Sequence, residues 1–219
     1  MASQTSIADF RSLEDFGSLL EVYSCSRPLH RGKQALSRGS AVAVSVGERS
    51  DFRSLEDFGS LSVHPVQRVR QALAAAGLDP DLVRELPTDT GTAEAAARAV
   101  DAPAGSIVKS LVFLADDNPL LVLVAGDRRA DVKRMRAELG LSKKRLRIAQ
   151  PAEVFELTGF EVGGVPPLGH CRPLRTLVDR SLGRFEIVWA AAGSAHAVFP
   201  VRYAQLVDIT QGEILDLAE

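Results

Sequence analysis

The chain has 219 residues, of which 46% are hydrophobic and 25% charged, so it is long and apolar enough to bury a sizeable core. Its formal net charge of −2 excludes a globally basic surface, so a nucleic acid would have to be held by a local patch. Two distant cysteines argue against a disulfide framework, and neither a secretory signal nor an apolar run of about 20 residues is visible, so we expect a cytoplasmic protein.

The first 62 residues differ from the rest of the chain and contain a perfect repeat. The 11 residues from Asp9 to Leu19 recur from Asp51 to Leu61, and two copies are too few for a stacked repeat fold. A Ser/Arg/Gly-rich stretch lies between them and has too few apolar residues to fold alone. We expect residues 1–62 to be a disordered or loosely docked extension, with a partner-docking peptide as the alternative, and residues 63–219 to form the domain.

From residue 64 the pattern becomes regular. A helix is predicted over Pro65–Ala76, because proline suits its first turn and Gly77 its end. A short strand is predicted around Leu82–Leu86. Thr92 can cap a second helix over Ala93–Val100.

The remaining elements mix hairpins with helices, which favours an α+β fold with a mixed, mostly antiparallel sheet and flanking helices. The first two strands form an antiparallel hairpin, because only a tight turn separates them. The predicted elements are, in order, strands Ile107–Ala115 and Leu120–Ala125, helices Ala130–Leu139 and Pro151–Thr158, strands Arg175–Asp179, Phe185–Ala192 and Ala195–Val198, and a helix beginning near Pro200.

One lysine stands in an apolar strand. Alternate side chains of a strand share a face, so Lys109 points the same way as Ile107, Leu111 and Phe113. An ammonium group on an apolar face is costly unless it meets an anion or a wet cleft. Lys109 is therefore a candidate catalytic residue, and the alternative is a lysine that extends along the surface to water.

A glycine- and proline-rich loop covers Gly163–Gly169. Gly163 and Gly164 let the backbone approach a ligand closely, and Pro167 stiffens the loop, so that N–H groups could be held ready for a carbonyl oxygen, carboxylate or phosphate. A rigid connector is the alternative interpretation.

A tight turn, Ala192–His196, separates two apolar strands. Turns at sheet ends often contact ligands, so Gly193, Ser194 and His196 are candidate binding residues. His196 could act as an acid or base near neutral pH, although a lone histidine in a turn is more often structural.

A local basic run follows the hairpin and could bind a phosphate backbone, with a solvated helix face as the alternative. Only Asp131 and Glu138 oppose it. Its cations are Arg128, Arg129, Lys133, Arg134, Arg136, Lys143, Lys144, Arg145 and Arg147.

Several familiar sites are missing from the sequence. It has no metal-ligand spacing of Cys and His, no nucleophile elbow, no P-loop and no dinucleotide-binding glycine motif. A nucleophilic pair of Cys171 and His196 is conceivable from residue types alone.

The strand lysine in Ile107–Leu111, the Gly163-x-x-x-Pro167 loop and the late Ala-Gly-Ser-Ala-His turn together resemble the YbaK/ProX family of aminoacyl-tRNA deacylases, relatives of the editing domain of bacterial prolyl-tRNA synthetases. The resemblance covers roughly Val63 to Glu219 and keeps the order of the elements.

The resemblance implies a single domain that hydrolyses the ester of a small mischarged amino acid on tRNA(Pro), without metal or other cofactor. Its implied partners are aminoacylated tRNA and prolyl-tRNA synthetase. Binding to a membrane or to DNA is not expected. Lys109 would bind the terminal phosphate or the substrate carbonyl. Gly163, Gly164 and Pro167 would hold the aminoacyl group, and the late-turn residues would border its pocket; Arg128, Arg129, Lys133, Arg134 and Arg136 are the candidate tRNA contacts.

Two other classes remain open. One is a non-catalytic module that binds tRNA or nucleotides through Lys109 and the basic run. The other is an interaction protein whose repeated Phe-containing peptides recruit a partner.

Overall fold

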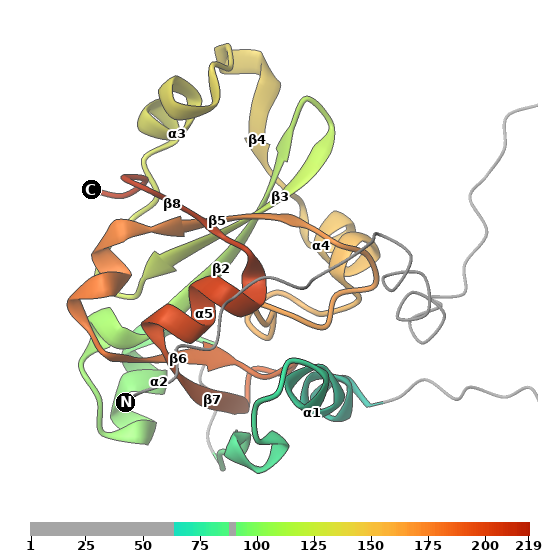
Figure 1. Cartoon of the computed structure of the whole chain (residues 1–219). Helices are drawn as coiled ribbons and strands as arrows, with labels where there is room; N and C mark the ends of the chain where they lie inside the picture. The colour runs from blue at the N-terminus through green and yellow to red at the C-terminus, as the bar shows by residue number, and fades with distance from the viewer. Residues whose placement is uncertain (1–63, 88–90) are drawn as a thin grey trace, which may run out of the picture.

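The computed structural model describes residues 64–87 and 91–219 (Figure 1). The repeat and the predicted extension lie outside the described residues, so the proposed boundary at residue 63 stays a prediction. The described residues form the predicted α+β fold, in which the antiparallel strand pairs outnumber the parallel ones.

The larger sheet has five strands in the order β4-β2-β3-β5-β8. Its centre is the predicted hairpin, in which Val108 of β2 lies opposite Ala125 of β3. Asp116 and Asp117 make the turn with φ of 51° and 62°, so both adopt the left-handed conformation that two-residue hairpin turns require. The strands of this sheet are β2 (Val108–Ala115), β3 (Asn118–Ala125), β4 (Leu146–Ile148), β5 (Arg175–Asp179) and β8 (Glu213–Leu215).

The two edges of the hairpin are covered unequally. On one side β5 pairs with β3 in parallel, and β8 extends the sheet. On the other side β4 pairs with β2 only from Phe113 to Ala115. The first half of β2 therefore has no partner strand on that edge among the described residues, and this open edge positions the candidate site.

The smaller sheet has three strands in the order β1-β7-β6, namely β1 (Arg84–Glu85), β7 (Ala197–Arg202) and β6 (Ile187–Ala191). A parallel bridge between Ile107 and Trp189 connects it to the beginning of β2. The predicted strand at Leu82–Leu86 shortens to β1, because the 3₁₀ turn η3 (Pro80–Leu82) occupies its first residue.

Side-chain caps account for where two of the helices begin. Thr92 Oγ1 accepts the N–H of Ala95, as predicted for the second helix. The helix predicted from Ala130 begins two residues later, because the Asp131 carboxylate caps it. The helices are α1 (Pro65–Ala75), α2 (Ala93–Val100), α3 (Val132–Leu139), α4 (Pro151–Thr158) and α5 (Tyr203–Thr210).

The predicted last helix is present, but it begins three residues later than Pro200. Pro200 lies in β7 opposite Trp189, and α5 begins at Tyr203. β1 pairs with β7 only at Ala197 and Val198, so the missing N–H of the proline interrupts no ladder there.

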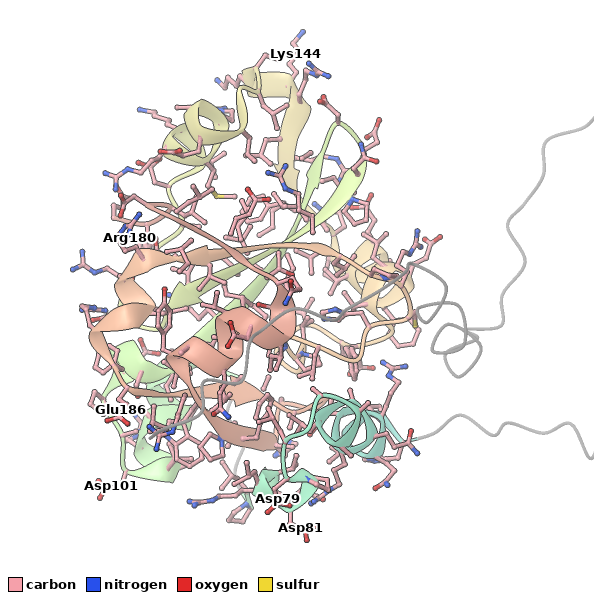
Figure 2. All side chains as sticks on the ribbon, viewed as in Figure 1. Asp79, Asp81, Asp101, Lys144, Arg180 and Glu186 are labelled. Atoms are coloured by element: carbon pink, nitrogen blue, oxygen red, sulfur yellow. The ribbon has the colours of Figure 1, made fainter. Side chains whose placement is uncertain are left out.

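Strand β3 is buried on both faces. Leu121 and Leu123 belong to the larger apolar cluster, which includes residues of α1, α5 and the smaller sheet. Leu120 and Val122 belong to a second cluster that includes α3. Charged side chains lie at the rim of the molecule, among them the six labelled in Figure 2: Asp79, Asp81, Asp101, Lys144, Arg180 and Glu186.

Candidate functional site

A cavity of about 220 Å³ lies at the open edge of β2. Its walls come from five places: the first half of β2, the beginning of α2, the loop after α4, the turn between β6 and β7, and parts of those two strands. The cavity therefore forms where the two sheets meet, beyond the point at which β4 stops pairing with β2.

Three of the predicted site residues line this cavity: Lys109, Gly163 and Ser194. They come from segments that are far apart in the sequence, so the fold brings together the strand lysine, the glycine loop and the late turn. Among the described residues that line the cavity, Lys109 is the only one with a charged side chain. Gly164, Pro167, Gly193 and His196 lie outside this lining.

Lys109 is partly buried, and its ammonium donates a hydrogen bond to the backbone carbonyl of Arg128. Burial lowers the pKa of Lys109, the carboxylates of Glu94 and Asp127 act in the opposite direction, and Arg129 lowers it further. The lysine thus has its carbonyl partner on the loop that follows β3. Three donors at the ammonium leave others free to reach a substrate.

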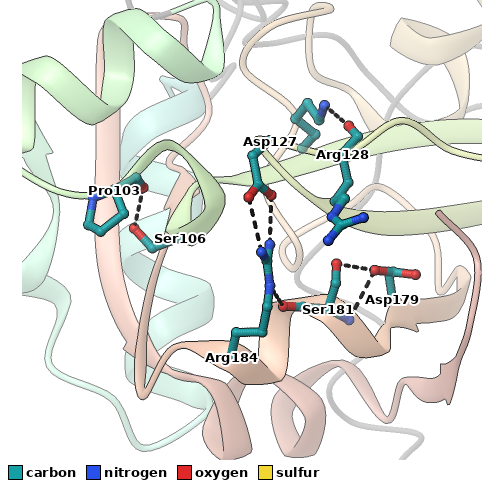
Figure 3. A network of polar contacts seen from close by, with 8 residues as sticks. Pro103, Ser106, Asp127, Arg128, Asp179, Ser181 and Arg184 are labelled. Carbon is teal, nitrogen blue, oxygen red and sulfur yellow. Dashed lines mark hydrogen bonds and ion pairs between the residues drawn. The ribbon is translucent and has the colours of Figure 1, made fainter. Parts of the chain in front are cut away.

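The loop that holds Lys109 is itself fixed by an ion pair. Asp127 accepts two hydrogen bonds from Arg184, at 2.6 and 3.1 Å, and this pairing holds the pKa of the Asp127 carboxyl below its usual value (Figure 3). A Cβ at Gly105 would lie 2.8 Å from an Asp127 oxygen, so any larger residue there would have to displace this carboxylate. We define Asp127, Arg184 and the Arg128 carbonyl as the charged support of Lys109.

The glycine loop is built on close backbone contact with the late turn. A Cβ on Gly164 would lie 2.7 Å from Cα of Ser194, and the Gly193 N–H donates to the Gly164 carbonyl at 3.1 Å. Gly163 and Gly193 have φ of 92° and 95°, which favours glycine at both. Gly164 and Gly193 therefore shape the wall that Gly163 and Ser194 present to the cavity.

The amides of this loop are not equally available to a ligand. The Gly164 N–H donates to the Glu161 carbonyl at 3.0 Å, and the Gly193 N–H is also engaged. Of the three glycine amides, only that of Gly163 makes no hydrogen bond within the part of the chain that the structure describes. Gly163 is thus the glycine whose N–H can face a substrate oxygen.

The far side of the loop packs against α1. His170 Nε2–H donates to the Pro166 carbonyl at 2.7 Å, and burial lowers the pKa of His170 to about 4, so the ring is neutral at pH 7. Arg68 of α1 lies 3.8 Å over the Phe160 ring and donates to the Gly159 carbonyl at 2.6 Å. Pro167 is buried in this layer. We define Arg68, Phe160 and His170 as the packed support of the loop.

His196 and Cys171 lie outside the cavity. The His196 side chain is exposed, while its N–H donates to Ser194 Oγ and its carbonyl accepts from the Leu86 N–H. Cys171 Sγ lies 4.0 Å from Arg68, behind the loop. Because neither residue lines the cavity, the structure offers no support for a nucleophilic pair there.

Sequence reasoning missed Trp189, the only tryptophan of the chain. It lines the cavity together with Ala93 and Ala96 of α2 and Ala191 of β6. The Arg84 guanidinium lies 4.9 Å over its ring. In a sequence, an aromatic residue in an alternating strand usually predicts a position in the hydrophobic core. Only the bridge between Trp189 and Ile107, which the structure shows, places Trp189 at the cavity.

The basic run does not form one uniform patch. Arg145 pairs with Asp116, and Arg147 with Glu153 at 2.7 Å. Arg134 of α3 lies 3.9 Å from Asp131. Arg128 and Arg129 lie on the loop that supports Lys109, whereas Lys133 and Arg136 lie on α3, at the end of the molecule away from α2 in Figure 1.

Residues 64–87 and 91–219 contain neither a metal-binding cluster nor a membrane-spanning helix. No group of three His, Cys, Asp or Glu side chains there could hold a metal ion. No helix in those ranges is long and apolar enough to cross a membrane.

Residues 88–209 match the family model of the aminoacyl-tRNA editing domain. The chain is 33% identical to the protein YwhH of Bacillus subtilis over 60% of its own length and 83% of that protein. It is 30% identical to a proline–tRNA ligase of Solidesulfovibrio magneticus, over 56% of its own length and only 22% of the ligase. A crystal structure of a candidate trans-editing enzyme for prolyl-tRNA synthetase is 42% identical, with a TM-score of 0.66, and the match covers 73% of this chain and 99% of that one.

Proposed function

The chain belongs to the family of aminoacyl-tRNA editing domains, and on this premise we propose that it is a trans-editing deacylase. It would hydrolyse the ester between a small mischarged amino acid and a proline-accepting tRNA, without a metal ion, in the cytoplasm. The domain would span residues 63–219. The similarity to a proline–tRNA ligase and to a candidate trans-editing enzyme supports this choice of tRNA, and prolyl-tRNA synthetase is the proposed second partner.

The observation that carries the proposal is the convergence of Lys109, Gly163 and Ser194 on one small cavity. A volume of about 220 Å³ suits a small amino acid. The Trp189 ring and the alanine-rich start of α2 both line the cavity and limit its space, so we expect a larger side chain to be excluded. Exclusion by size discriminates more sharply against a larger amino acid than against a smaller one.

Lys109 supplies the positive charge. Its ammonium would bind either the terminal phosphate or the carbonyl oxygen of the ester, where negative charge develops during attack. The Gly163 N–H would contribute a second donor to the same substrate group. The hydrogen bond to the Arg128 carbonyl and the Asp127–Arg184 pair behind it would favour one position of the ammonium, so its contribution would be one of preorganised position.

No carboxylate or histidine is among the described residues that line the cavity, so a side-chain general base is not part of the proposal. An aminoacyl ester is already activated, and a positioned water needs only a proton acceptor of modest strength. A ribose hydroxyl of the substrate itself can relay the proton. Positioning and electrostatic stabilisation would then provide the rate.

The test is a deacylation panel. We would charge tRNA(Pro) with alanine, cysteine, serine, 2-aminobutyrate or proline and compare the wild type with Lys109→Met. We expect release of one small amino acid, with proline spared, and a decrease in kcat/KM of on the order of 100-fold or more in the variant. Arg180→Met, which removes an exposed cation outside the basic run and the cavity, is the control and should leave turnover unchanged.

If the protein binds tRNA but hydrolyses none of the esters, the proposed enzymatic function is wrong and the alternative, a non-catalytic tRNA-binding module, is favoured. Full activity in a folded Lys109→Met protein would contradict the proposed role of the lysine. Deleting residues 1–62 should leave deacylation intact, and loss of a bound partner on that deletion would assign the repeated peptide a docking role.

A further inference from the structure

A second hollow adjoins the cavity. It is lined by Pro151 and Phe155 of α4 and by Glu161 and Val162 of the following loop. Val162 lines both the hollow and the cavity, so the two spaces share a wall. We name this second space the Phe155 hollow.

The hollow exposes an unusual amount of apolar surface. Val162 is 61% exposed and Phe155 is 56% exposed, the highest values among the large hydrophobic residues that the structure describes. Single exposed apolar residues are common, but two that meet in one concave place beside a substrate cavity indicate a ligand contact.

We propose that the Phe155 hollow binds the terminal adenine of the tRNA whose aminoacyl group occupies the cavity. This inference rests on the proposed function. The amino acid of an aminoacyl-tRNA is esterified to the ribose of a terminal adenosine, so the base must emerge close to the mouth of the cavity. Because Val162 lines both spaces, the hollow lies beside the cavity, within reach of a base carried on that ribose.

The chemistry of the hollow fits an adenine. Its flat π-face stacks on aromatic side chains, and Phe155 presents an exposed ring. The Glu161 side chain, which is exposed at the same place, carries acceptors only, so it can accept a hydrogen bond from the exocyclic amino group of adenine. The hollow thus offers a ring for stacking and an acceptor for the amino group, two contacts that an adenine can use.

Phe155 is held on a helix with fixed ends. The Gln150 N–H donates to the Glu153 carboxylate at 2.8 Å, Glu153 also pairs with Arg147, and Gly159 ends α4 with φ of 73°. A stacking residue on such a helix loses little freedom when the base binds. The same four-residue hollow is too small for a stable protein partner, which needs about 800 Å² from each side.

The first experiment measures base binding without catalysis. Adenosine 5′-monophosphate is titrated into the full chain, and the NMR signals of Phe155 and Val162 are followed, with ribose 5-phosphate, which lacks the base, as the comparison. We expect the nucleotide to shift these signals and ribose 5-phosphate to leave them unchanged, and we expect Glu161→Ala to raise the nucleotide concentration that is needed. Absence of shifts at Phe155 and Val162 would overturn the proposal.

The second experiment compares Phe155→Ala with Ile148→Ala, which removes another exposed hydrophobic residue, 52% exposed, that does not line the hollow. We expect Phe155→Ala to raise KM for the mischarged tRNA roughly 10-fold with kcat little changed, because lost base stacking weakens binding throughout the reaction. Ile148→Ala should leave KM unchanged, and Phe155→Tyr should restore it.

The outcomes separate the two proposals. If the nucleotide shifts the Phe155 signals but the protein deacylates no tRNA, the proposed function is contradicted and the adenine site is supported. If Phe155→Ala deacylates the tRNA normally and with an unchanged KM, the proposed adenine site is contradicted and the proposed function is not. Self-association that Phe155→Ala abolishes would instead make the hollow an interface between copies and overturn the inference.

Discussion

The two walls of the cavity are held in place by different kinds of interaction. Lys109 depends on the charged support, in which Asp127 and Arg184 are each more than a third exposed. The glycine loop depends on close backbone contact with the late turn and on the packed support, where Phe160 is only 1% exposed. A charged support in water is weak and adjustable, whereas a packed support is strong and intolerant of added atoms. The two walls should therefore respond to different perturbations.

The sharpest way to break the packed wall is to add one methyl group. In Gly164→Ala the new Cβ would lie 2.7 Å from Cα of Ser194, which is backbone and cannot rotate away. The loop and the turn must separate, and Gly163 moves with them. We expect kcat/KM for the mischarged tRNA to decrease by roughly 10- to 100-fold, because displacement of about 1 Å is costly for a positioned substrate.

Gly77→Ala is the control for this variant. Gly77 has φ of 73°, but a Cβ added there would meet nothing within 4 Å, so the change strains the backbone without a clash. It should decrease stability by about 1 kcal/mol and leave kcat/KM unchanged. Equal activity in Gly164→Ala and the wild type would show that the contact between loop and turn does not position the site.

Acid offers a second way to separate the walls, through the packed support. The folded pKa of His170 is about 4, below its ordinary value of 6.5. Between these values the unfolded chain binds a proton that the folded protein does not. The contribution of His170 to the free energy of unfolding is therefore at its maximum above pH 6.5 and decreases as the pH falls toward 4. Because the residue keeps some exposure to water, we expect about 2 kcal/mol to be lost between pH 7 and pH 4 through this group.

Urea unfolding at pH 7, 5.5 and 4.5 measures this loss. His170→Gln keeps a donor for the Pro166 carbonyl but cannot be protonated, so its stability should change less over the same range. The pKa of Asp127 lies below its usual value, so the charged support should be little affected between pH 7 and 5. Identical slopes for the wild type and His170→Gln would remove His170 as the titrating group.

The contrast between the walls also explains what the sequence could predict. The hairpin, α2 and α4 carry local signals, such as Thr92 at a helix start or Gly159 at a helix end, and these elements were predicted almost to the residue. Lys109 and the glycine loop were found because their residue types are unusual where they stand. Strands β4 and β8 have three residues each, too few to show a period.

Long-range partners carry no such signal. Arg184 and Asp127 are separated by 57 residues, and nothing local to either residue indicates the other. Trp189 likewise reaches the cavity only because β6 meets the beginning of β2. The support of a site therefore lies in contacts that a single sequence does not reveal, even where the sequence indicates the site itself.

The smallest expected effect comes from breaking the charged support. Arg184→Gln leaves the Asp127 carboxylate with a weaker partner, so the loop that carries the Arg128 carbonyl becomes more mobile. The Lys109 ammonium, which donates to this carbonyl, then becomes more mobile as well. Because the pair is partly exposed, we expect stability to change by less than about 1 kcal/mol and kcat to decrease roughly 3-fold. Asp127→Asn should have a similar effect, and the double variant should cost no more than either single change.

Arg202→Gln, which breaks an exposed pair with Glu186 in the smaller sheet, should leave kcat unchanged. If Arg184→Gln and Arg202→Gln behave alike, the ion pair contributes to the surface and not to the position of Lys109, and the two walls of the cavity no longer differ in the way described.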